Sequence, residues 1–200
     1  MGSKERILRL KEETRINILE AALVIVKEEG WQALSMRKIA DRIEYTAPII
    51  YEYFSNKDAI LLELTRKGFL ILATDLEKAK AQHNTPDKQL EAMWLAYWNF
   101  AFANKELYQV MFGVTTNCSC SEVKGLPEAD LPWDLFTPVI GQLMKIDNLD
   151  SDIICTKYYT FWSVVHGLVS INILGRDSSD DINKQVLMDA ITGIITSIKV

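Results

Sequence analysis

Apolar residues recur at intervals of three and four through most of this 200-residue chain. This spacing places them on one face of an α-helix, whereas a half-buried strand would alternate apolar and polar residues. The chain contains neither a sustained alternation of that kind nor an Asn-Gly or Asp-Gly hairpin turn. The pattern therefore predicts an all-α protein.

Capping residues divide the first eighty residues into four predicted helices. The first should stop before Gly30, which occupies a typical C-terminal position. Ser35 and Thr46 each precede a short helix and can cap it, and Ser55 and Asp58 stand in capping-box spacing before a long one. The four helices are expected to end near residues 29, 42, 54 and 80.

Five more predicted helices and one long loop follow. Thr85 and Pro86 start a helix that should end near residue 103, and Asn104 can cap a short helix as far as Gly113. The prolines and glycine of residues 114–136 predict a long loop with one helical turn at most. The remaining helices are expected to start at Thr137–Pro138, to span about 151–174, and to span about 181–199.

Residues 35–54 combine two short helices and a turn within 20 residues, which is the spacing of a helix-turn-helix. Five apolar residues fall where the two helices should face the core: Ile39, Ala40, Ile43, Ile50 and Phe54. The opposite face of the second helix is then free to enter the major groove of double-stranded DNA. A plain helical hairpin is the structural alternative.

Charge is divided unevenly along the chain. Residues 1–67 hold 12 Lys and Arg against 11 Asp and Glu, a net charge of +1, and residues 68–200 hold 10 against 16, a net charge of −6. Phosphate repels an acidic surface, so any contact with nucleic acid should fall in the first third.

The N-terminal segment resembles the tetracycline-repressor (TetR) family of transcriptional regulators. The resemblance rests on Ile18–Ala22, Gly30, Leu34–Ala40, Ile50–Phe54 and Asn56–Lys57. It implies that Arg37, Tyr51, Tyr53 and Lys57 contact phosphate and that Ala47, Pro48 and Ile49 face bases. The predicted DNA-binding residues are Arg37, Thr46, Ala47, Pro48, Ile49, Tyr51, Tyr53 and Lys57.

Two departures from the family pattern concern the helix-turn-helix. The family usually has glycine in the turn, where this chain has Glu44, so the turn must accommodate a side chain. The residues expected to face bases offer few hydrogen bonds. We therefore expect specificity to depend on contacts with thymine methyl groups and on DNA shape.

The C-terminal part resembles the family subgroup named for a Trp-His-Gly signature, through Trp162, His166 and Gly167 and through the earlier segment Leu107–Phe112. His166 is either a hydrogen-bonded core residue or a ligand contact. Bulky rings with few charges can line a pocket for an apolar or aromatic effector, although most should be core. The predicted ligand-binding residues are Trp94, Trp98, Tyr108, Phe112, Trp162 and His166.

Two apolar stripes near the C-terminus predict a homodimer. One stripe lies on each of the last two helices, and two such helices from each subunit would form a four-helix interface. The predicted interface residues are Phe161, Val164, Leu168, Leu187, Ile191, Ile194 and Ile198.

The sequence gives little support for an enzyme, a metalloprotein or a membrane protein. The chain has two histidines and no phosphate loop, nucleophile elbow or clustered metal ligands, so we predict neither an enzyme nor a bound cofactor or metal. Cys118, Cys120 and Cys155 are expected to be reduced thiols, with metal binding or oxidant sensing as the alternative. No segment reaches the roughly 18 apolar residues of a membrane span and no signal-peptide core follows Met1, which favours a cytoplasmic location.

Together these patterns predict a DNA-binding domain over residues 1–57 and an effector-binding and dimerisation domain over 58–200. Its partners should be double-stranded operator DNA, a small-molecule effector and a second copy of the chain. We expect a repressor that binds a near-palindromic operator and is released by its effector. An organiser of DNA with the same fold but no effector is the first alternative, and a small-molecule carrier or enzyme is the second.

Overall fold

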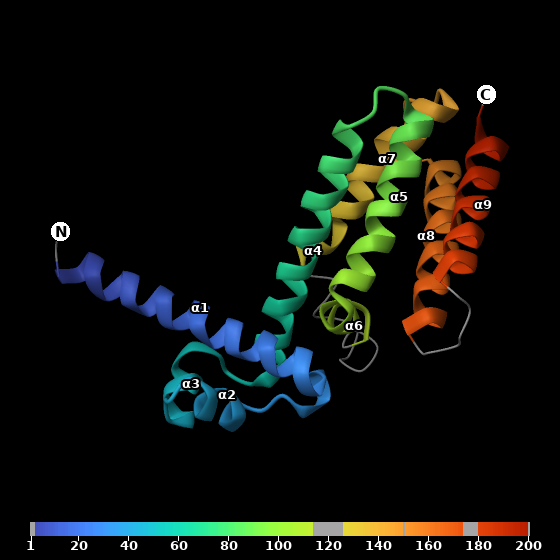
Figure 1. The fold of residues 1–200 in the computed structure, drawn as a ribbon. Coiled ribbons are helices and arrows are strands. Elements are labelled where there is room, and N and C mark those ends of the chain that lie inside the picture. The colour runs from blue at the N-terminus through green and yellow to red at the C-terminus, as the bar shows by residue number, and fades with distance from the viewer. Residues whose placement is uncertain (1–2, 114–125, 150, 174–179, 200) are drawn as a thin grey trace. The chain divides into compact units, whose positions relative to one another are not determined.

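The computed structural model describes residues 3–113, 126–149, 151–173 and 180–199. These residues form helices and their connections, with no strand among them, which confirms the predicted all-α class. The chain, drawn in Figure 1, divides into two compact units. The first unit comprises residues 1–68 and 106–126, and the second comprises 69–105 and 127–200.

The first unit is built around α1 (Ser3–Glu29), α2 (Met36–Arg42) and α3 (Ala47–Tyr53). Figure 1 shows α2 and α3 side by side next to the C-terminal half of α1. The start of α4 (Lys57–Ala81) and most of α6 (Lys105–Gly113) complete this unit. Its core contains the fully buried side chains of Ile18, Ala22, Val26, Ile39 and Ile50.

The division of the chain differs from the predicted boundary after residue 57, because it falls inside α4 at Gly68. At this position α6 packs closely against α4. A Cβ on Gly68 would overlap Met111 and would lie 3.3 Å from Cγ of Leu107. This close approach makes α6 part of the first unit, although it lies about forty residues further along the chain.

The second unit contains the rest of α4 and five further elements. These are α5 (Pro86–Ala103), the short 3-10 helix η4 (Pro127–Asp130), α7 (Leu131–Met144), α8 (Asp152–Ile173) and α9 (Asp180–Ile198). The helices α5, α7, α8 and α9 pack on one another, and α8 and α9 run side by side (Figure 1). An ion pair of 2.9 Å between Lys199 Nζ and Asp87 Oδ2 joins the end of α9 to the start of α5. The Thr85 hydroxyl and Lys199 both lower the pKa of the Asp87 carboxyl.

Two local predictions were wrong. The α7 helix begins at Leu131, not at Thr137–Pro138, so Pro138 lies in the helix interior. Burial of Phe136, Val139 and Ile140 on one face outweighs the cost of an interior proline, about 3 kcal/mol. At the start of α4, the cap is Asn56 and not Ser55, since Asn56 Oδ1 accepts a hydrogen bond of 2.9 Å from the amide of Ala59.

Candidate functional site

The helix-turn-helix of the first unit is formed by α2 and α3. Ser35 caps α2 as predicted, because its Oγ accepts a hydrogen bond of 3.2 Å from the amide of Lys38. Thr46 is the N-cap residue of α3 but makes no capping hydrogen bond with its side chain. Its hydroxyl is exposed, so it is available to a ligand.

Glu44 occupies the turn in the left-handed conformation, with φ of 59°. The amide of Tyr45 donates a hydrogen bond of 2.9 Å to the carbonyl of Ala40, which closes the C-terminus of α2. This is the helix stop in which glycine is most common, because glycine has no Cβ to strain the backbone. The turn therefore keeps the geometry expected for glycine and carries a carboxylate in addition.

Ion pairs fix α2 against α1. The Arg42 guanidinium donates two hydrogen bonds to the Glu28 carboxylate, of 2.7 and 3.0 Å, and these bonds lower the pKa of Glu28 and raise the pKa of Arg42. Lys38 pairs with Glu29 in the same interface. Both ends of α2 are thus held to α1, although such exposed pairs contribute little stability individually.

Arg15 holds the C-terminal end of α3. Its guanidinium lies over the Phe54 ring, 5.2 Å from the centroid, and one of its nitrogens is 3.1 Å from the Glu63 carboxylate. Arg66 also contacts Glu63, at 3.3 Å. These contacts connect α1 and α4 to the end of α3, so Arg15 has a structural role.

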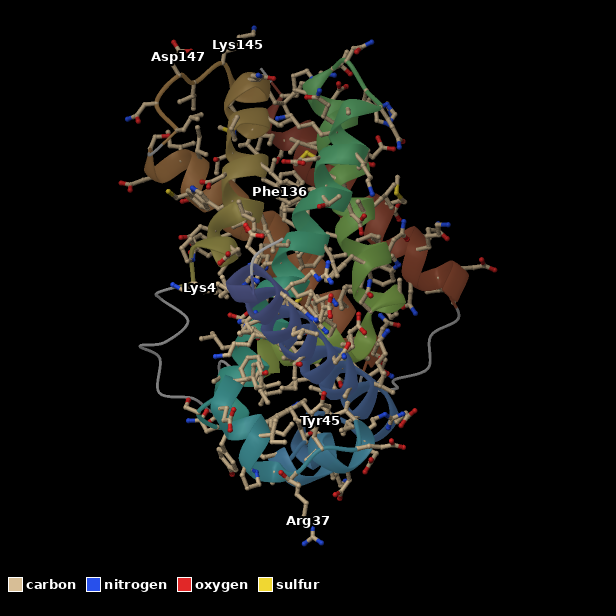
Figure 2. All side chains as sticks on the ribbon, turned by 90° about the vertical axis from the view of Figure 1, so that its left-hand side faces the viewer. Lys4, Arg37, Tyr45, Phe136, Lys145 and Asp147 are labelled. Carbon is tan, nitrogen blue, oxygen red and sulfur yellow. The ribbon has the colours of Figure 1, made fainter. Side chains whose placement is uncertain are left out.

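The predicted DNA-binding residues lie on α2, on α3 and its N-cap, and at the start of α4. Half of these side chains are exposed: Arg37, Thr46, Pro48 and Tyr51. The other half are half-buried: Ala47, Ile49, Tyr53 and Lys57. Figure 2 shows Arg37 extending from α2 into solvent, and it forms no ion pair with another described residue. Tyr51 is 55% exposed. These positions fit contact with an external polyanion, and their roles remain predictions.

The predicted ligand-binding residues fall in both units. Tyr108 and Phe112 belong to the first, where their rings lie 4.6 Å apart. In the second unit, Trp94 is fully buried, with its ring 3.9 Å from that of Phe136 and 5.5 Å from that of Phe161. Trp94 is therefore part of the core. Its Nε1 hydrogen nevertheless finds no acceptor among the described residues.

His166 belongs to a smaller cluster at the edge of this core. Its ring stacks on that of Trp162 at 4.7 Å, and its Nδ1 is 3.2 Å from the hydroxyl of Tyr97. His166 and Trp162 are half-buried, and burial lowers the pKa of His166. Trp98 is also half-buried, and its ring is tilted against that of Phe102, with the centroids 4.6 Å apart.

Four of the seven predicted interface residues proved to be core residues of their own subunit. Phe161, Leu187 and Ile191 are fully buried within the single chain, and Ile198 nearly so. These side chains pack among α5, α8 and α9, so they cannot be exposed to a partner. The other three remain available: Leu168 and Ile194 are half-buried and Val164 is 39% exposed.

The described residues give no support to a metal or membrane site. They contain no group of three or more His, Cys, Asp or Glu side chains that could hold a metal ion. Among the helices of the same residues, none combines the length and apolar character needed to cross a membrane. Cys155 is a half-buried free thiol, and Cys118 and Cys120 lie outside the described residues.

Comparison with known families agrees with this geometry. The model for bacterial regulatory proteins of the tetR family matches residues 18–64, which include the whole helix-turn-helix. The model for the tetracyclin repressor-like C-terminal domain matches residues 90–191, about half of the chain. The chain belongs to the TetR family. It is therefore a DNA-binding transcriptional regulator and not an enzyme, while the Trp-His-Gly subgroup stays a prediction.

Two relatives and one solved structure are also similar to this chain. The chain is 28% identical over 142 residues to the transcriptional activator FasR of Mycolicibacterium smegmatis, covering 68% of this chain and 65% of FasR. It is 30% identical over 81 residues to the repressor KstR of the same organism, covering 40% of each chain. A Rhodococcus protein of unknown function shares the fold with a TM-score of 0.79 and 20% identity, covering 93% of this chain and 95% of that one.

Two exposed side chains of the TetR-type helix-turn-helix were missing from the predicted site. Tyr45, which is 42% exposed, precedes the N-cap of α3, and Glu52 is exposed on α3 itself. The helical period could have predicted that Glu52 is exposed, because Glu52 lies two residues after the inward-facing Ile50 and therefore on the opposite face of the helix. Tyr45 lies in the turn, where no such periodicity applies.

Proposed function

We propose that this TetR-family regulator is a homodimeric repressor that binds a near-palindromic operator and is released by a small apolar or aromatic effector. Operator binding places it in the bacterial cytoplasm, with the chromosome. The proposal of an effector rests on Trp94, because its buried indole N–H lacks an acceptor among the described residues.

DNA binding is assigned to the exposed side of α2 and α3. Lys38, Arg42 and Arg15 are held by carboxylates, whereas Arg37 extends into solvent. Tyr51 on α3 adds a hydroxyl, and Lys57 at the start of α4 adds a cation. Phosphate contacts of this kind position a recognition helix in the major groove.

The homodimer is assigned to the outward faces of α8 and α9. Val164 and Ile171 on α8 and Ile182 and Val186 on α9 are exposed apolar side chains. A Cβ added to Gly193 would meet nothing within 4 Å, so the surface of α9 is open at this point. Small residues beside apolar ones allow two helices to approach closely, and a two-fold dimer would match the symmetry of a palindromic operator.

The effector site is restricted to the predicted ligand residues of the second unit: Trp94, Trp98, Trp162 and His166. A buried donor without an acceptor costs about 1–3 kcal/mol, which an effector that supplies a hydrogen-bond acceptor would recover. The three half-buried rings offer an apolar surface that a ligand can approach from solvent. We therefore expect an effector with an aromatic body and one acceptor group.

A close stack of aromatic rings supports the alternative, a DNA organiser without an effector. The rings of Phe136 and Phe161 lie on Trp94 at the distances given above, so side chains already fill this part of the core. If the whole domain is filled in this way, no ligand would enter it. The two functions differ in whether any compound changes the affinity for DNA.

The test couples ligand binding to operator binding. An operator is first selected from randomised duplex DNA with the full-length protein, and compounds are then screened by tryptophan fluorescence. We expect one that quenches emission to lower operator affinity by roughly 5- to 150-fold, with the reciprocal effect on ligand affinity. Trp98→Phe should weaken the fluorescence response, and Trp31→Phe, in the first unit, is the matched control.

A reporter gene placed behind the selected operator gives the sign of regulation. Repression by the protein, relieved by the compound, is the expected result. Activation of the reporter would reverse the proposed sign, as in the relative named as an activator. Compounds that bind without changing operator affinity would favour the organiser.

A further inference from the structure

Glu52 occupies the centre of the outward face of α3. Ile50, which is fully buried, marks the inward face of this helix. Each residue turns an α-helix by about 100°, so Glu52 lies about 200° from Ile50, nearly opposite to it. Pro48 lies about 160° from Ile50 on the other side, and both side chains are exposed. A helix that enters a groove with its outward face would therefore present Pro48 and Glu52 first.

The neighbours of Glu52 cannot substitute for it as a hydrogen-bonding group. Ala47, Pro48 and Ile49 carry no polar side-chain atoms, and Tyr51 lies to one side of the outward face. Glu52 makes no hydrogen bond or ion pair with another described residue. It is thus the polar side chain that α3 directs straight outward, and nothing within the described part of the chain engages its carboxylate.

The chemistry of the major groove limits what a carboxylate can read. A carboxylate accepts hydrogen bonds and donates none. The base edges in the major groove offer two donors, the N4 amino group of cytosine and the N6 amino group of adenine. Adenine also presents the acceptor N7 beside its amino group, which repels a carboxylate. Cytosine is the base that fits.

We propose that Glu52 is a specificity-determining residue that selects a cytosine at one position of each operator half-site. The inference rests on the proposed binding of DNA through α3. Glu52 would add one direct hydrogen bond to the methyl contacts and DNA shape on which specificity is expected to depend.

The same carboxylate should weaken binding to all other sequences. Phosphates on both sides of the groove repel a negative charge, and only a base donor compensates for bringing it there. Glu52 would thus discriminate in two ways, by attraction to the correct base and by repulsion elsewhere. Removal of its charge should therefore have opposite effects on non-specific and on specific recognition.

The experiment compares the parent protein with Glu52→Gln and with Glu44→Gln. Both variants lose one negative charge from the helix-turn-helix, but Glu44 lies in the turn and not on the outward face of α3. Full-length proteins are used to select operators from randomised duplex DNA. Each selected operator is then titrated together with its single-base variants and with a scrambled duplex.

For the parent and for Glu44→Gln, we expect a cytosine at one symmetric position of each half-site whose replacement weakens binding roughly 5- to 100-fold. For Glu52→Gln, the same replacement should change the affinity by no more than about 2-fold, well below the usual cost of a mismatch. Affinity of Glu52→Gln for the scrambled duplex should rise. Glu52→Ala should behave in the same way, and thermal unfolding of each variant verifies that it is folded.

An unchanged base preference in Glu52→Gln would overturn the inference, as would the loss of a preference for any base other than cytosine. Equal effects of Glu44→Gln and Glu52→Gln at that base would also overturn it, because they would indicate a general charge effect. If the parent selects no sequence at all, the proposed operator binding fails instead.

Discussion

Aromatic side chains lie in different surroundings on the candidate DNA surface of the first unit and in the core of the second unit. In the first unit, Tyr45 and Tyr51 are exposed beside the recognition helix, whereas Trp94, Phe136 and Phe161 of the second unit are fully buried. These exposed tyrosines of the candidate DNA surface therefore contribute little to folding. In the second unit, Trp94 belongs both to the candidate effector site and to the core. A substitution there must therefore be chosen so that its effect on effector binding can be told apart from its effect on the free energy of unfolding.

The largest effect that follows from this contrast is expected from Trp94→Ala. Loss of a fully buried, stacked ring should lower the free energy of unfolding by about 3–5 kcal/mol. Trp94→Phe keeps an aromatic ring and removes the unpartnered N–H, so it should cost much less. Urea unfolding measures both. Equal losses for the two variants would show that the ring is not the stabilising feature.

The second-largest effect is expected from a substitution that separates the dimer and thereby lowers its affinity for DNA. Gly193→Arg should leave the subunit folded, because the position is open, but should separate the dimer if α9 faces its partner. Gly193→Ala is the matched control and should remain dimeric. A monomer should bind the operator at least roughly 100-fold more weakly than the dimer does, because the two half-sites of the operator are no longer bound by linked subunits.

Sedimentation velocity measures the state of the Gly193 variants. A Gly193→Arg protein that stays dimeric would move the interface to another surface. A dimer that persists while DNA affinity falls would instead indicate an effect on the first unit.

Substitutions at the DNA surface should change affinity without changing stability. Tyr51→Ala and Lys57→Ala should each weaken operator binding by about tenfold, as expected for loss of a phosphate contact. The salt slope should fall by about one for Lys57→Ala. Tyr51→Phe keeps the ring and isolates the hydroxyl. Wild-type affinity in a titration at fixed salt would remove either residue from the site.

The pH dependence of the second unit should reflect His166. Burial lowers the pKa of this residue, so the folded state favours its neutral form. The unfolded chain takes up the proton near its ordinary pKa, about 6.5, and stability therefore falls as the pH drops below that value. The loss levels off once the pH passes the lower pKa of the folded state.

Denaturant unfolding at about pH 7.5 and about pH 5.5 tests this linkage, since the two values bracket the ordinary histidine pKa. His166→Gln should reduce the loss of stability on acidification, and His83→Gln, at the other histidine, is the control. An equal loss in the parent and in His166→Gln would assign the pH dependence to other groups.

The smallest effect is expected from Glu44→Gly. Its left-handed backbone strains a residue with a Cβ, by about 1 kcal/mol, but glycine also gains entropy in the unfolded chain. The net result should be a gain in stability of about 0.5 kcal/mol, seen as a higher urea midpoint. A clear loss of stability would mean that the Glu44 side chain makes contacts that matter more than the strain.

Local signals in the sequence sufficed for the helix-turn-helix. Ser35 and Thr46 marked the starts of α2 and α3, and Ile39 and Ile50 marked the inward faces, because caps and helical period act within a few residues. Membership of the TetR family was recognisable from the same segment.

Signals that depend on distant packing were less informative. Pro138 suggested a helix start, but burial of its neighbours in α7 carries the helix through it. On α9, the stripe of Leu187, Ile191 and Ile198 was correctly identified as apolar, yet it faces its own subunit. Both faces of α9 carry apolar residues, so the spacing alone could not decide which one meets a partner.

We propose that two copies of this chain bind one operator through exposed residues of α3. A titration of the selected operator with the full-length protein, over a series of salt concentrations, tests it most directly. We expect two chains per operator and an affinity that decreases steeply as salt increases. Absence of binding even at low salt, or one chain on an asymmetric site, would contradict it.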